Sequence, residues 1–259
     1  NNGVMPFRDN NEHNMRYEVR DSYGNLSTLE FKVLSIADPA HVPPEMKAEP
    51  DAIFKHDEDN LFVRDDVVVI IPPYRLYEDL EFVFGESDTL WNCITPVYHI
   101  HHEYVPVDKH YTLRIRVDEV PKHLQDKILI TKVSGKSYHR AKGGRYKDGW
   151  ISTLVREFGD FTVRADTTAP SIRSINVYNG KKMAGSTRMD FKINDNLAGI
   201  KHFDARVGGQ WILMEYEPKN HRLTHYLTKG EIKPGTHEFI LKVTDERNNV
   251  GKYKATLHF

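Results

Sequence analysis

The chain has 259 residues, of which 39% are hydrophobic and 11% aromatic, so it holds enough apolar material for two or three packed domains. Lysine and arginine number 36 against 37 aspartates and glutamates, which lacks the basic excess typical of nucleic-acid-binding proteins. The longest apolar stretch, Val67 to Ile71, is far too short to cross a bilayer, so we expect neither a nucleic-acid partner nor a membrane span. The single cysteine, Cys93, cannot form an internal disulfide, and we expect a small buried side chain there.

Apolar and polar residues alternate with a period of two through most of the chain. The alternation is clearest over residues 15–20, 111–117 and 239–243, and Gly, Asn, Asp and Pro recur between such segments. Only residues 120–127 are compatible with a short helix, which would begin at Pro121, where a missing N–H does no harm. Short strands separated by regular turn signals predict an all-β chain of sandwich domains.

A turn motif of the form V-x-D-x-x-x-N occurs at residues 19–25 and again at 243–249, each time before a further strand. An aspartate at the end of a strand accepts hydrogen bonds from the turn amides, and Gly or Asn tolerates the positive φ that reverses the chain. Two copies of one closing hairpin imply two sandwiches of one type. The first copy closes at about residue 36, and 36 residues are too few for a sandwich of roughly 100 residues. Residues 1–36 are therefore predicted to be the terminal strands of an incomplete β-sandwich.

Two segments mark the expected domain boundaries. Residues 37–60 are rich in proline and acidic residues and have no periodicity, which predicts an extended linker. A second boundary falls at the sequence DTTAP, just before a new run of strands. We therefore expect one β-sandwich domain over 61–165 and a C-terminal one over 166–259.

Several motifs in the second half of the chain resemble those of known proteins. Residues 166–172 (DTTAPSI) and 195–200 (DNLAGI), with Gln210-Trp211 and the closing 243–249, resemble immunoglobulin-like modules of exported bacterial proteins. Before them, residues 148–163 carry DGWI, REFG and FTV. That order resembles the C-terminal half of Gram-negative proteins with a lysostaphin-like (LytM-type) zinc metallopeptidase domain nearer the N-terminus. The resemblance covers nearly the whole chain and implies an all-β fold of tandem immunoglobulin-like β-sandwich domains.

The resemblance also implies a function. In that family the N-terminal domain cleaves peptidoglycan cross-bridges with a zinc ion held by H-x-x-x-D and H-x-H motifs. No histidine here is followed four residues later by Asp, and the H-x-H at residues 99–101 lacks the glycine-rich context. We therefore expect a non-catalytic accessory region, with no cofactor, which positions, shields or targets an N-terminal catalytic domain that is absent from this chain. Its expected location is the periplasm, the cell envelope or the exterior of a bacterium.

Histidines near the middle of the chain are a weak candidate metal site. His99 and His101 would point to one face of a strand, roughly 6.5–7 Å apart. A third ligand such as His110 would allow the pair to hold zinc or copper. The same alternation also fits an ordinary strand whose histidines face solvent.

A basic and aromatic stretch around Gly143–Gly144 is the candidate glycan or peptidoglycan site. Aromatic rings stack on sugar faces, and cations suit carboxylates. The two glycines predict a hairpin tip, and an ordinary hairpin with a core tryptophan fits the same sequence. The candidate binding residues are Tyr138, Arg140, Arg145, Tyr146 and Trp150.

Acidic residues leave two further alternatives. The acidic residues at 65–66 and 78–81 would also suit a stand-alone enzyme that hydrolyses glycosides, although nothing in the sequence isolates one carboxyl group in an apolar pocket. The loops at Asp195 and Asp245 contain oxygen ligands of the kind that calcium binds, but they lack EF-hand spacing and fit local turn chemistry. The alternative to an accessory region of a peptidase is an independent surface glycan-binding or adhesion module.

Overall fold

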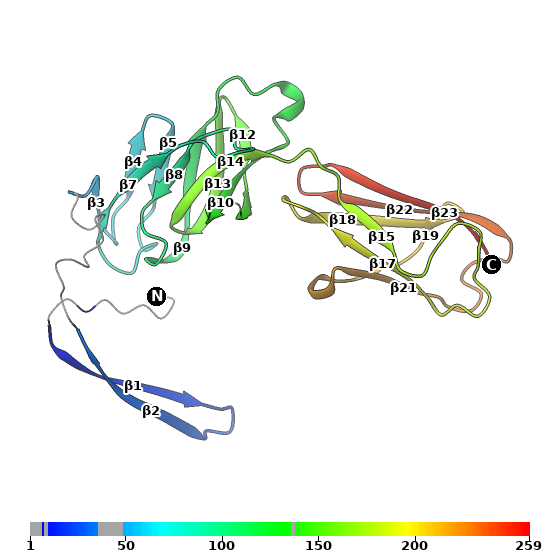
Figure 1. Ribbon diagram of the computed structural model, residues 1–259, viewed down its shortest axis with the longest axis horizontal. Helices are drawn as coiled ribbons and strands as arrows, with labels where there is room; N and C mark the ends of the chain where they lie inside the picture. The colour runs from blue at the N-terminus through cyan, green and yellow to red at the C-terminus, as the bar shows by residue number, and fades with distance from the viewer. Residues whose placement is uncertain (1–6, 8–9, 36–48, 136–137) are drawn as a thin grey trace.

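The computed structural model describes residues 7, 10–35, 49–135 and 138–259, and regular structure in them is almost entirely β-strand. Two sandwich domains follow each other along the chain, preceded by a hairpin (Figure 1). This arrangement confirms the predicted all-β fold of tandem β-sandwich domains. No helix in the described ranges is long and apolar enough to cross a membrane.

The N-terminal hairpin consists of β1 (Glu12–Arg20) and β2 (Leu26–Leu34), which pair only with each other. Its turn has the expected chemistry, because Asp21 Oδ1 accepts the amides of Tyr23 and Asn25 at 2.9 Å each. Large apolar side chains on the hairpin remain exposed, among them Val19 at 68% and Leu29 at 61%. That these strands close an incomplete sandwich stays a prediction.

The first sandwich is built from two five-stranded sheets and a short strand pair. One sheet runs in the order β11 (Tyr138–Gly143), β10 (Ile128–Ser134), β14 (Gly159–Ala165), β8 (Val97–Ile100) and β7 (Phe84–Ser87). The other runs β12 (Arg145–Lys147), β13 (Trp150–Glu157), β9 (Pro106–Arg116), β5 (Val67–Ile71) and β4 (Asn60–Arg64). The pair is β3 (Ala52–Phe54) and β6 (Leu80–Phe82), and the expected short helix is a 3₁₀ turn, η2 (Lys122–Leu124).

This domain begins at residue 51 rather than at the expected residue 61. Phe54 is 2% exposed and stacks on Phe82 with ring centroids 4.6 Å apart, so β3 belongs to the core. Asp51 accepts hydrogen bonds from Arg64 Nη2 at 2.9 Å and from the Phe84 amide at 2.8 Å. The apolar segment of β3 is only three residues long, too short to show a period. The remainder of the predicted linker, up to residue 48, lies outside the described residues.

The second sandwich has the strand order of an immunoglobulin domain. One sheet runs β15 (Ser171–Ser174), β17 (Arg188–Asn194), β21 (Arg222–Tyr226) and β20 (Glu215–Glu217). The other runs β16 (Lys181–Lys182), β23 (Val250–His258), β22 (Thr236–Asp245), β18 (Ile200–Val207) and β19 (Gln210–Trp211). When the strands are lettered in chain order, the first sheet is the A-B-E-D sheet of that fold and the second contains its G-F-C strands. A 3₁₀ turn, η3 (Pro218–Asn220), joins β20 to β21. The predicted immunoglobulin-like module is confirmed here.

The turn between β22 and β23 joins the second sandwich to the first. Arg247 in this turn donates from Nη1 to the carbonyl oxygens of Ile128 and Gly144, at 3.0 Å each. In return, Lys127 Nζ donates to the Arg247 carbonyl oxygen at 2.6 Å. These bonds cross between the two domains, so the joint has a specific geometry as well as a covalent linker.

Candidate functional site

The residues predicted to bind a glycan are divided between the two sheets of the first sandwich. Gly143 and Gly144 form the crossover between the sheets rather than a hairpin tip, because β11 pairs with β10 and β12 pairs with β13. Gly144 has φ of 126°, and a Cβ there would lie 2.9 Å from Ile151 Cγ1. On the first sheet lie Tyr138 and Arg140, and on the second lie Arg145, Tyr146 and Trp150.

The aromatic members of this group are partly used in packing. Tyr146 is half-buried against the core, and its hydroxyl donates to the Val117 carbonyl oxygen at 3.1 Å. Trp150 is half-buried, and the Arg114 guanidinium lies 5.0 Å from the centroid of its ring. The side chain of Tyr138 lies outside the described residues. Glycan binding by this group stays a prediction.

The three candidate metal-binding histidines lie in different surroundings. His99 Nδ1 lies 2.6 Å from Asp160 Oδ1. His101 has φ of 54°, which takes it out of the strand alternation, and its buried ring contacts Phe158 at 5.2 Å between centroids. His110 is exposed on β9. In the described ranges these histidines do not converge on one point as metal ligands would.

The acidic group at residues 78–81 lies exposed and is engaged in surface ion pairs. Asp79 accepts hydrogen bonds from Lys55 Nζ at 2.7 Å and interacts with His56 Nδ1 at 2.9 Å. The hydrogen bond from Lys55, followed by that from His56, holds the pKa of Asp79 well below its usual range. A general acid of a glycosidase needs a raised pKa, so the environment of this carboxylate is the opposite of the one required.

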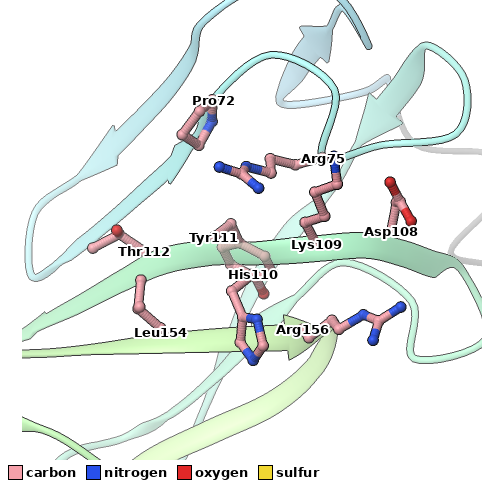
Figure 2. A pocket seen from close by; sticks show the side chains of 9 residues that line it. All are labelled: Pro72, Arg75, Asp108, Lys109, His110, Tyr111, Thr112, Leu154 and Arg156. Atoms are coloured by element: carbon pink, nitrogen blue, oxygen red, sulfur yellow. The ribbon is translucent and has the colours of Figure 1, made fainter.

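An open depression of about 580 Å³ lies where the loop at residues 72–77 passes over strands β9 and β13. Figure 2 shows the side chains that surround it. We call it the basic groove, and define it by its lining residues: Pro72, Arg75, Asp108, Lys109, His110, Tyr111, Thr112, Leu154 and Arg156.

The basic groove carries more positive than negative charge. Arg75, Lys109 and Arg156 contribute cations, whereas Asp108 is its only carboxylate. Within the part of the chain that the structure describes, none of the three cations forms an ion pair, and Arg75 Nε is buried without a hydrogen-bond partner. Unpaired guanidinium and ammonium groups around a depression favour an anionic ligand, and guanidinium groups bind carboxylates in a bidentate manner.

The loop above the basic groove is held in a specific conformation. Tyr74 has φ of 59°, uncommon for a residue with a bulky side chain, and its amide donates to the His56 carbonyl oxygen at 2.7 Å. The carbonyl oxygen of Arg75 accepts the Asp108 amide at 2.9 Å, which ties the loop to β9. Tyr74 and Tyr77 are 64% and 60% exposed, so aromatic side chains flank Arg75 on both sides in the sequence.

The sequence argument missed the basic groove. Two sequence features could have indicated it. One is PPYRLY at residues 72–77, directly after the buried strand β5, and the other is the set of outward-facing positions of β9 and β13. Tyrosines and an arginine after two prolines are typical of an exposed, rigid loop. Their proximity to Lys109 and Arg156 follows from strand pairing between β9 and β13, which no local pattern reveals.

The first sandwich is similar to a known domain family. Residues 51–166, the first sandwich, match the model of the Zu5-like domain family. No curated protein matches the chain. Among solved structures, the fibronectin(III)-like modules of Clostridium thermocellum CbhA are similar, at 10% identity, over 58% of this chain and 85% of that one. The TM-score is 0.29, so this likeness carries no weight for either the fold or the site.

Proposed function

We propose that this chain is the non-catalytic accessory region of a cell-wall peptidoglycan endopeptidase, and that it targets the enzyme by binding carboxylate groups of peptidoglycan in the basic groove. The observation that carries the proposal is a set of three cations, Arg75, Lys109 and Arg156, that surround one open depression and form no ion pair with any described residue. The peptidase parent rests on the motif order given above. The ligand class rests on the charge of the groove.

The chemistry of peptidoglycan suits this surface. Its peptide stems end in carboxylates, which arginine binds with two parallel hydrogen bonds, and its sugars offer apolar faces to aromatic rings. The groove is open to solvent rather than enclosed, so a polymer can lie across it without threading. Exposed Tyr74 and Tyr77 beside Arg75 place stacking groups next to a cation.

The joint between the sandwiches supports a positioning role. Arg247 and Lys127 make hydrogen bonds that cross between the domains, so the two sandwiches are held in a defined relation. An accessory region that binds the wall at one point then fixes where an attached catalytic domain can reach.

The test is cosedimentation of the purified chain with peptidoglycan sacculi. We compare the wild type with the double variant Lys109→Gln/Arg156→Gln, and use as the control Arg140→Gln/Arg145→Gln, which alters the competing site that the sequence alone predicted. Both variants remove two exposed positive charges from the first sandwich. We expect the groove variant to lose most of its binding and the control to bind like the wild type, with binding that weakens as salt increases. Equal binding by all three proteins, or loss only in the control, would contradict the groove as the binding surface.

The second candidate function is an independent surface glycan-binding module, which the exposed rings of Tyr74 and Tyr77 favour. Binding to neutral oligosaccharides distinguishes this alternative from the leading proposal. If this alternative holds, Tyr77→Ala abolishes binding to a neutral glycan while Lys109→Gln/Arg156→Gln leaves it intact. Under the leading proposal, neutral oligosaccharides bind far more weakly than sacculi, because the aromatic rings then act without the cations.

A further inference from the structure

Three aspartates from separate segments meet at the end of the second sandwich that faces the first. Asp166 follows β14, Asp195 follows β17 and Asp245 is the last residue of β22. One carboxylate oxygen of each lies within 4.8 Å of the other two. Asp166 and Asp245 are only 2% and 0% exposed, so water screens their charges poorly.

The loops at Asp245 and Asp21 show which hydrogen bonds normally occupy both carboxylate oxygens of an aspartate in this type of turn. Asp245 Oδ1 accepts the amides of Arg247 and Asn249 at 2.8 Å each, and its Oδ2 accepts Asn249 Nδ2 at 2.7 Å. In the N-terminal hairpin, Asp21 makes the corresponding bonds, with Oδ2 accepting Asn25 Nδ2 at 2.7 Å. In both loops the asparagine four residues after the aspartate supplies the partner of the second oxygen.

The loop at Asp195 lacks that partner. Its Oδ2 accepts the amides of Leu197 at 3.0 Å and Gly199 at 2.8 Å, as the pattern requires. The position four residues on is Gly199, which has no side chain to bind the other oxygen. Among the described residues, Asp195 Oδ1 therefore has no hydrogen-bond partner, and this oxygen is inaccessible to solvent although the residue as a whole is only half-buried. A buried, unpaired carboxylate oxygen beside two further carboxylates is costly unless a cation binds it.

Within the described ranges, no lysine or arginine nitrogen lies within 4.0 Å of a carboxylate oxygen of the three aspartates, so no described protein cation pairs with them. Arg247 is close enough to interact electrostatically with Asp245 and Asp166, but its Nη1 bonds to carbonyl oxygens of the first sandwich.

We infer that Asp166, Asp195 and Asp245 form a binding site for one Ca²⁺ ion at the joint between the two sandwiches. Calcium takes six to eight oxygen ligands at 2.3–2.6 Å, so its ligand oxygens lie at most about 5.2 Å apart, and three carboxylate oxygens within 4.8 Å of one another are close enough to share one ion. Magnesium demands near-ideal octahedral ligands at about 2.0–2.1 Å, whereas calcium accepts irregular sets such as carboxylates from three separate segments. The bound ion ties the linker residue Asp166 to two loops of the second sandwich and so stiffens the joint.

The experiment is calorimetric titration of CaCl₂ into the complete chain after removal of divalent ions with EDTA. The test variant is Asp195→Asn, which keeps an oxygen for the two loop amides and replaces the unpaired oxygen with an NH₂ group. The matched control is Asp21→Asn, which makes the same change in a loop of the same kind outside the cluster. Thermal unfolding of each protein, with and without Ca²⁺, gives the second readout.

We expect the wild type and Asp21→Asn to bind one Ca²⁺ ion, and Ca²⁺ at a hundred times its Kd to raise the unfolding midpoint by on the order of 10 °C. Asp195→Asn binds no Ca²⁺, and without Ca²⁺ it unfolds at or above the temperature of the calcium-free wild type, because its amide donates to the neighbouring carboxylates. A simple loss of fold would instead lower that temperature. Absence of binding to the wild type at millimolar Ca²⁺, unchanged binding to Asp195→Asn, or equal affinity for Mg²⁺ would overturn the inference.

Discussion

His101 makes the stability of the first sandwich sensitive to acid. Its ring is 8% exposed and packs against Phe82 and Phe158. Nδ1 accepts the Val83 amide at 3.3 Å, and Nε2 is buried without a partner. Burial, with a smaller contribution from the neighbouring His102, lowers the pKa of His101 to about 3.

The sign and size of the effect follow from the two protonation equilibria. In the unfolded chain the pKa of a histidine is about 6.5, so the unfolded state takes up a proton at a higher pH than the folded state does. The contribution of neutral His101 to the free energy of unfolding is fully present above pH ~6.5 and is lost as the pH falls toward the folded-state pKa of about 3. Between pH 7 and pH 5 the loss amounts to about 2 kcal/mol.

Urea unfolding at pH 7 and pH 5, followed by the fluorescence of the half-buried Trp150, measures this loss. The comparison is with His101→Asn, because asparagine tolerates the φ of 54° at this position and does not titrate. The variant is less stable at both pH values, since it loses the ring contacts, and the change between pH 7 and pH 5 is the readout. The wild type should lose about 2 kcal/mol more than the variant over this range. Equal losses in the two proteins would refute the reasoning, whatever the other histidines contribute.

Three further substitutions test other contacts. Glu157→Gln removes the carboxylate shared by Lys132 and Lys142, whose side chains are 10% and 12% exposed, and leaves Lys132 only Glu103 at 3.5 Å. It should lower the free energy of unfolding by about 3 kcal/mol in urea titrations, and a cost below about 1 kcal/mol would contradict a role for this cluster. Arg247→Met removes the side-chain hydrogen bonds between the domains, so NMR relaxation should show the two sandwiches tumbling more independently, whereas unchanged joint tumbling would contradict a specific joint. Gly159→Ala forces a φ of 127° on alanine and should cost about 1–3 kcal/mol by thermal unfolding; an unchanged midpoint would show that the backbone relaxes there.

The sequence predicts those parts of the fold that depend on local pattern. Alternation and turn residues predicted the strands, and the D-x-x-x-N turns at Asp21 and Asp245 have the bonds expected of them. The immunoglobulin-like order of the second sandwich followed from its motifs. By contrast, β3 was assigned to a linker, because three residues show no period and the core contact of Phe54 is made with Phe82, far along the chain.

The sites depend on long-range pairing, and here the sequence is less informative. Gly143 and Gly144 suggest a hairpin, but the adjacent strands join different sheets, which separates the predicted binding residues. The basic groove forms only when β9 and β13 pair beneath the loop that carries Arg75. The aspartate cluster likewise combines a linker with two loops, so local spacing at Asp195 and Asp245 indicates only turn chemistry.

The central claim is that the basic groove recognises carboxylate groups of peptidoglycan. The most direct test is binding of the wild-type chain to native sacculi and to sacculi whose carboxylates have been chemically amidated. Amidation removes the negative charge and leaves the glycan strands in place. The account predicts that native sacculi retain the chain and amidated sacculi release it. Equal retention by both would contradict recognition of carboxylates by Arg75, Lys109 and Arg156.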